Sequence, residues 1–125
     1  MNDGARFWAM AGAANAFLAV AAGAFGAHGL RSRVSGRMLE VFETGARYQM
    51  FHALGLLAVA WLASQREGVA NAAGGAMLAG VVLFSGSLYA MALTGVTKLG
   101  MVTPLGGVGF LVGWVLFARA VMALR

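Results

Sequence analysis

The chain contains no cysteine and only four acidic residues, and both shortages narrow what it can be. Without cysteine it forms no disulfide, no thiolate metal site and no cysteine nucleophile, although this says nothing about its compartment. Charged residues make up only 10% of its 125 residues, whereas a soluble domain needs about 25% to cover its surface. Water therefore cannot solvate most of this surface, which predicts an integral membrane protein.

Apolar residues are abundant instead, at 61% of the chain with a mean hydropathy of +0.81. They form unbroken runs of about 20 residues, which suit transmembrane helices, whereas the strands of a β-barrel alternate over about 10 residues. The formal charge of +5 comes from basic residues placed at the ends of these runs. That distribution suits lipid headgroups and not nucleic acid, which calls for a continuous basic face.

Four such runs predict an all-α membrane protein, a four-transmembrane-helix bundle in one domain spanning residues 1–125. The spans are expected at about residues 7–27, 39–63, 70–93 and 104–122. About 20 residues at 1.5 Å each reach roughly 30 Å, the thickness of a bilayer core. Four spans place both termini on the same side. Basic residues are nearly balanced between the two sides, and the arginine-rich linker 31–37 only slightly favours a cytoplasmic position for its side.

Helix ends can be placed by their capping residues. Ser35 is expected to cap the second helix, and Thr103 the fourth, with Pro104 at the first helical position. An alternative reading of the first run is a secretory signal peptide, with Arg6 before it and small residues near Gly23, but the run is long for that role.

Small residues recur in the spans at three- and four-residue spacing, as in Gly109-xxx-Gly113. Such positions let helix backbones approach closely where lipid is as apolar as the side chains. The expected helix-packing positions are Gly23, Gly26, Gly86, Gly109 and Gly113.

Residues 40–52 form the most polar stretch within any expected helix. On a helical wheel, Glu43 and Arg47 stand four residues apart in the favourable order for an ion pair, and Tyr48 and His52 share the same spacing. The opposite arc is expected to face lipid. It consists of Phe42, Ala46, Met50 and Ala53.

Three interpretations of this stretch stay open. Its polar groups are solvated at the membrane surface, as fits Glu40, or they are buried between helices and fix the packing, or they form a proton relay or ligand site. In the buried case, Glu43, Arg47 and His52 bond backbone carbonyls or the Ser85/Tyr89 face of the third span. The candidate polar cluster is His28, Glu43, Arg47, Tyr48, Gln49, His52, Ser85 and Tyr89.

No catalytic motif accompanies this cluster, and no cofactor is expected. His28 is expected to cap the end of the first helix. Its pairing with His52 around a haem or metal is a weak alternative, because no third ligand is evident. No nucleophile elbow, HExxH helix or phosphate-binding loop is present.

Four segments resemble a known family. They are Gly23–Leu30, Phe42–Leu54, Phe84–Tyr89 and Thr103–Gly107. In this order they are similar to the domain of unknown function 423 family, which includes the animal transmembrane protein 256, and the resemblance extends over essentially the whole chain. It implies a small multi-span membrane protein and brings no activity with it. The family's motif positions would be Gly26, His28, Glu43, Arg47, Tyr48, Gln49, His52, Ser85, Gly86, Tyr89, Thr103, Pro104 and Gly106.

The sequence therefore predicts a non-enzymatic protein of the bacterial inner membrane, surrounded by lipids, whose polar cluster holds the bundle together, alone or as a homo-oligomer. One alternative is a small transporter or oligomeric channel that uses Glu43, Tyr48 and His52. Another is a lipid or quinone site formed by Tyr48, His52 and the 31–37 linker. A small-molecule ligand is not identified.

Overall fold

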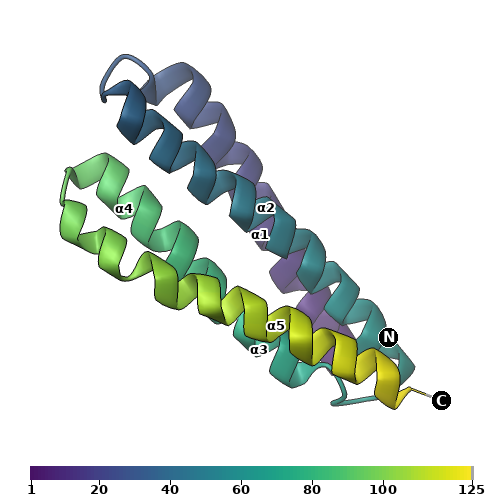
Figure 1. Ribbon diagram of the computed structural model, residues 1–125. Coiled ribbons are helices and arrows are strands. Elements are labelled where there is room, and N and C mark those ends of the chain that lie inside the picture. Colours follow the sequence, from purple (N-terminus) through teal and green to yellow (C-terminus); the bar gives the residue numbers. More distant parts are fainter. Residues whose placement is uncertain (125) are drawn as a thin grey trace.

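The computed structural model describes residues 1–124, and every regular element within them is a helix. In chain order the elements are α1 (Asp3–Phe25), the π-helical turn η1 (Gly26–Leu30), α2 (Gly36–Gln65), α3 (Asn71–Gly80), the π-helical turn η2 (Val81–Ser85), α4 (Gly86–Thr94), the 3₁₀ turn η3 (Thr97–Met101) and α5 (Thr103–Ala123). Because α1 continues into η1, and α3 into η2 and α4, the chain forms four long helices (Figure 1). The all-α prediction is confirmed.

Three of these long helices are apolar enough to cross a membrane. They are Asp3–Leu30, Asn71–Thr94 and Thr97–Ala123. The exception is α2, which is 30 residues long but carries two arginines and two glutamates in its first half. Its second half is apolar, so α2 is polar at one end of the bundle and apolar at the other.

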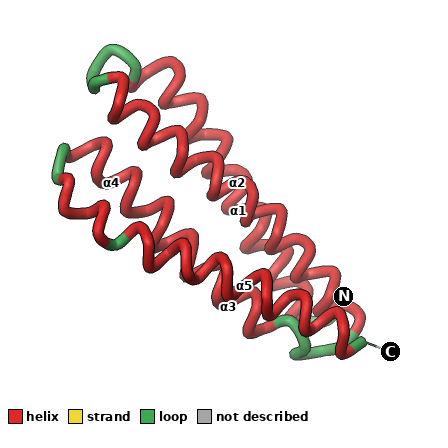
Figure 2. The backbone as a smooth tube through the Cα atoms, in the orientation of Figure 1, coloured by secondary structure: helices red, strands yellow, loops and turns green. Residues whose placement is uncertain are grey.

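The helices form two antiparallel hairpins, α1 with α2 and α3–α4 with α5 (Figure 1). α2 also packs against α3, η2 and α4 and touches α5, so α2 makes most of the contacts between the two hairpins. Figure 2 shows the 31–35 loop and the α4–α5 connection at one end of the bundle. The α2–α3 turn lies at the other end, where α1 begins and α5 ends. The end that holds the 31–35 loop and the α4–α5 connection is called the loop end below.

Two of the helix starts are capped by side chains. Asn2 accepts a hydrogen bond from the backbone N–H of Ala5 at 2.8 Å, and Ser35 accepts one from Met38 at 3.2 Å. The Ser35 cap was predicted and is confirmed. The Thr103 cap was wrong, because the helix turns already at Val102 and the threonine hydroxyl instead lies 2.6 Å from that of Ser87.

The largest apolar core lies near the end of the bundle that holds the chain termini. The indole of Trp8 packs there against Gly74 and donates a hydrogen bond to Asn71 at 3.0 Å. A smaller cluster around Phe42 lies near the loop end. The larger core consists of Ala5, Trp8, Leu56, Val59, Ala60, Leu62, Ala63, Ala70, Ala73, Met77 and Ala120.

The orientation of the first half of α2 differs from the expected one. Phe42, Ala46 and Ala53 were expected to face lipid, but all three are buried against other helices. Glu40 and Arg47 are turned outward instead. The charged side chains lie in the half of α2 nearest the loop end, and burying them unpaired between helices would cost more than burying small apolar side chains.

Candidate functional site

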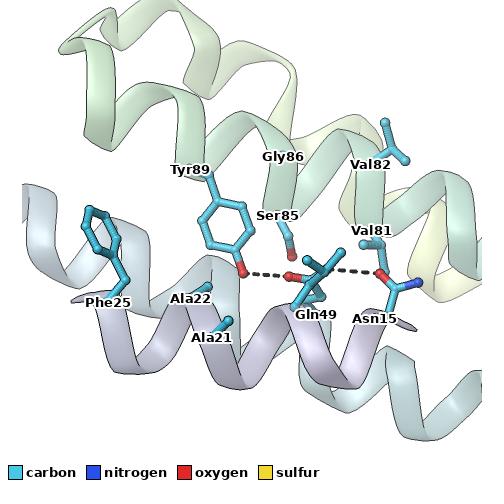
Figure 3. A pocket seen from close by; sticks show the side chains of 11 residues that line it. Asn15, Ala21, Ala22, Phe25, Gln49, Val81, Val82, Ser85, Gly86 and Tyr89 are labelled. Atoms are coloured by element: carbon cyan, nitrogen blue, oxygen red, sulfur yellow. Dashed lines mark hydrogen bonds between the residues drawn. The ribbon is translucent and has the colours of Figure 1, made fainter. Parts of the chain in front are cut away.

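The middle of the bundle holds a chain of side-chain hydrogen bonds that joins three helices. Gln49 on α2 donates to Asn15 on α1 at 2.9 Å and accepts from the hydroxyl of Tyr89 on α4 at 2.7 Å (Figure 3). Asn15 in turn donates to the carbonyl of Ala11 at 2.9 Å. Gln49 is only 5% exposed, so this amide is the buried centre of the network.

The direction of every bond in this network follows from its last acceptor. Because the Ala11 carbonyl can only accept, the amide nitrogen of Asn15 must face it, and the Asn15 oxygen must face Gln49. The Gln49 nitrogen then donates to Asn15, which leaves the Gln49 oxygen for Tyr89. Each group in the network therefore has one donor or acceptor role, fixed by its neighbours.

A second bond joins α2 to η2 just beside this network. The buried hydroxyl of Ser85 donates to the Gly45 carbonyl at 2.7 Å. A Cβ atom at Gly45 would lie 3.0 Å from the Tyr89 ring, so only glycine allows α4 to approach α2 this closely. Ser85 is the last residue of η2, and π-turns often occur at functional sites.

His52 lies on a different face of α2, against α5. Its Nδ1 is 2.7 Å from the Tyr48 carbonyl, and its Nε2 accepts a hydrogen bond from the indole N–H of Trp114 at 3.0 Å. A carbonyl only accepts and an indole N–H only donates, so the imidazole is the neutral tautomer with its proton on Nδ1. The ring of Phe110 stacks on it with centroids 3.5 Å apart. Both ring nitrogens are thus occupied.

The charged residues of the stretch stand apart from these two sites. Arg47 is exposed and Glu43 half-buried, and together with Glu40 and Thr44 they line a polar pocket of about 370 Å³ near the loop end. Glu43 lies beside Gly26 of η1, whereas His52 faces α5. The dry cluster expected around Glu43, Arg47 and His52 is therefore not formed, because nine residues turn a helix by about 900° and put the two groups on opposite faces.

The side chains of His28 and Tyr48, which were also predicted to belong to the polar cluster, take part in neither the Gln49 network nor the hydrogen bonds of His52. His28 is exposed in η1 at the loop end, whereas His52 lies 16 residues into α2, roughly 24 Å along its axis. The ring of Tyr48 is 37% exposed and leans on Phe84 with centroids 4.8 Å apart. Within residues 1–124, no group of three His, Asp or Glu side chains is placed to hold a metal ion.

Of the five predicted packing glycines, three lie in close helix contacts and two do not. A Cβ atom on Gly109 would lie 3.2 Å from the Cα of Gly80, and one on Gly113 would lie 2.7 Å from the Met77 side chain. A Cβ atom on Gly26 would lie 3.2 Å from the Phe42 ring. A Cβ on Gly23 or Gly86 would meet nothing within 4 Å, so these two do not mediate close helix contacts.

A groove of about 650 Å³ runs beside the Gln49 network, between α1 on one side and η2 and α4 on the other. Figure 3 shows its apolar walls, which include Phe25, Ala21 and Val82, with Gln49 and Tyr89 at its floor. Leu18, Phe25 and Val82 are also exposed on the outer surface, so the groove opens sideways from the bundle. Its lining is Asn15, Leu18, Ala21, Ala22, Phe25, Gln49, Val81, Val82, Ser85, Gly86 and Tyr89.

Sequence reasoning did not identify Asn15 and Trp114 as members of these sites. Asn15 is the single polar side chain between Phe7 and Ala27, and a lone amide in an apolar span is a signal for an interhelical hydrogen bond. Trp114 carries a weaker signal, an indole in the middle of α5 and not near the ends of this apolar helix, where tryptophan is usually enriched in membrane spans.

Comparison with known proteins identifies relatives over most of the chain. Residues 22–107 match the model of the family described as Protein of unknown function (DUF423). The chain is 50% identical to the UPF0382 membrane protein YwdK of Bacillus subtilis over 111 residues, which are 87% of this chain and 90% of that protein. It is 48% identical to the UPF0382 membrane protein SSP2132 of Staphylococcus saprophyticus over 105 residues, 84% of this chain and 88% of that one.

No solved structure matches the chain significantly. The matched region contains Gln49, His52, Ser85 and Tyr89, while Asn15 and Trp114 lie outside it. The family model and the bacterial relatives agree with the apolar helices of the structure. The chain thus belongs to the DUF423 family of membrane proteins, whose biochemical function is unknown.

Proposed function

We propose that this protein is a non-enzymatic four-span protein of the bacterial inner membrane, with a structural or assembly role that depends on one fixed packing of its helices. α2 lies alongside α1 over most of its length, so it crosses the membrane wherever α1 does. The four spans then place both ends of the chain on the same side, in agreement with the bundle in Figure 1.

The charges in the first half of α2 are compatible with a fourth span. They lie toward the loop end, and Arg47, the deepest of them, is 11 residues from the start of α2, roughly 16 Å along the axis. An arginine side chain at this depth can extend toward the surface. Membrane lipids, or a second copy of the chain, cover the exposed apolar faces of α1 and α5.

One observation carries the structural role. Among residues 1–124, no buried side-chain nitrogen or oxygen lacks a hydrogen-bond partner. Several of these bonds join different helices, from Asn15 through Gln49 to Tyr89, from Ser85 to α2, and from Trp114 to His52. Satisfied polar groups inside a membrane fix helix positions because breaking any of them leaves a polar group in hydrocarbon.

The same geometry speaks against a proton carrier that uses Glu43, Tyr48 and His52. Glu43 and His52 face different neighbouring helices, and both nitrogens of His52 are already bonded within the protein. A relay needs groups that can exchange protons along one connected path.

Proton flux into liposomes separates the two roles. Protein is reconstituted with a pH-sensitive dye inside the vesicles, a pH step is applied outside, and wild type is compared with Glu43→Gln and with empty vesicles. We expect equal dye responses in all three. A faster response that requires Glu43 would contradict the structural proposal and support a carrier.

A further inference from the structure

The groove beside Gln49 combines an apolar wall with a small neutral polar floor. Its only polar residues are Asn15, Gln49, Ser85 and Tyr89, and none of them carries a charge. Its volume of about 650 Å³ lies in the range of small-molecule sites, roughly 300–1,000 Å³.

The polar floor has hydrogen-bonding capacity that the protein does not use. Gln49 donates one of its two amide hydrogens to Asn15, and the Tyr89 hydroxyl donates to Gln49 while its own lone pairs receive no bond from the described residues. A second N–H and an acceptor oxygen are thus adjacent at the floor. In hydrocarbon no water satisfies them, so a ligand with one small polar group would gain both bonds.

The floor is also deep in the bundle. Gln49 lies 13 residues after the start of α2 and 16 before its end, which are roughly 20 and 24 Å at 1.5 Å per residue. A charged headgroup at this depth would lose its hydration without any opposite charge in the lining. A neutral head on an apolar chain can reach it from the side.

We propose that the groove binds a neutral amphiphile of the lipid phase, a long apolar chain with an uncharged oxygen-containing head that accepts a hydrogen bond from Gln49. A hydroxyl head would also donate to Tyr89, and a carbonyl head would use the Gln49 N–H alone. Isoprenoid or fatty alcohols and isoprenoid quinones share this chemistry.

Gly86 keeps the groove open. It lines the groove, and a Cβ atom there would meet nothing within 4 Å, so a larger side chain would fill the groove without disturbing a helix contact. Gly75 offers the matched control, because it is an exposed glycine of the same span with equally open space but lies outside the groove.

The test uses hexadecanol with a photoactivatable diazirine near its hydroxyl, added to purified protein in phosphatidylcholine nanodiscs. Cross-linked peptides are located by mass spectrometry for wild type, Gly86→Leu, Gly75→Leu and Gln49→Leu. We expect the label on residues 15–25 and 81–89, its loss in Gly86→Leu and its retention in Gly75→Leu. Gln49→Leu should lower labelling by roughly three- to tenfold through the lost hydrogen bond.

Competition identifies the head group. Unlabelled hexadecanol, a quinone with a short isoprenoid tail, and hexadecyl phosphate are each added in excess. Displacement by the alcohol, the quinone or both supports the site and tells which source it prefers. Equal displacement by hexadecyl phosphate would overturn the neutral head. Label spread over the outer faces of α1 and α5, unchanged in Gly86→Leu, would overturn the site.

Discussion

Replacing Gln49 with leucine removes a side chain that bonds both α1 and α4. The substitution keeps a buried side chain of similar length but takes away the donor to Asn15 and the acceptor for Tyr89, at 2.9 and 2.7 Å. It also leaves the Asn15 oxygen and the Tyr89 hydroxyl without these partners. The helices therefore lose their polar connection while their apolar contacts remain.

The expected cost follows from interhelical hydrogen bonds measured in other membrane proteins. Such a bond contributes about 0.6 kcal/mol on average and about 1.7 kcal/mol at most, so two bonds give roughly 1–3 kcal/mol. The buried position of Gln49, only 5% exposed, favours the upper part of this range because water cannot replace the lost partners.

The assay is reversible unfolding in mixed micelles with increasing dodecyl sulfate, followed by circular dichroism. Gln65→Leu is the matched control: it makes the same chemical change at the exposed end of α2, where the amide bonds only the adjacent Ser64. We expect its free energy of unfolding to stay within about 0.5 kcal/mol of wild type.

A double-mutant cycle tests whether the loss belongs to the network. Tyr89→Phe removes only the hydroxyl, so its effect and that of Gln49→Leu should not add, with a coupling energy of about 0.5–1.5 kcal/mol. If the two effects add without coupling, or if Gln49→Leu costs no more than Gln65→Leu, the hydrogen bond does not hold the helices and the structural role loses its basis.

Three further substitutions test other contacts in the same assay. Trp114→Phe removes the indole donor to the imidazole on α2 and should cost about 1 kcal/mol, whereas Trp61→Phe on the exposed face of α2 should cost less than about 0.5 kcal/mol; equal costs would contradict the bond. Gly106→Ala brings a Cβ atom against the backbone of Phe84 in η2 and should cost about 1–3 kcal/mol of unfolding free energy. Gly75→Ala places its Cβ in open space and should be neutral or stabilising. The reverse order of the two costs would refute the close contact. Ser35→Ala removes the cap of α2 and should cost about 1 kcal/mol, and an unchanged stability would show that the cap contributes nothing.

The helices could be predicted because apolar run length reports directly on the lipid solvent. The same signal weakens for α2, whose polar first half breaks the run, and Ser35 marks its start better than hydropathy does. The missing Thr103 cap could not be predicted, because the threonine hydroxyl lies 2.6 Å from that of Ser87, which belongs to a neighbouring helix.

The sequence pointed to Gln49, His52, Ser85 and Tyr89 as candidates but not to their arrangement. A helical wheel puts Glu43, Arg47 and His52 within half of its circumference, with Glu43 and His52 at the two edges of that half, and it does not tell which arc the neighbouring helices cover. The structure covers the arc of Phe42 and Gln49, and the charges face outward. Asn15 is distant in sequence from the polar stretch, so only the packing of α1 on α2 brings it to Gln49.

The π-helical turn η2 sets the rotation of α4 about the helix axis relative to α3. A π-turn holds one residue more than the α-helical turn it replaces, and a residue corresponds to about 100° of helix rotation. Deleting one residue from Val81–Ser85 would restore a regular helix, yet it would swing Tyr89 away from Gln49 by that angle. A one-residue deletion here would leave composition and hydropathy nearly unchanged while separating Tyr89 from Gln49, so the length of this segment matters to the network independently of its residue identities.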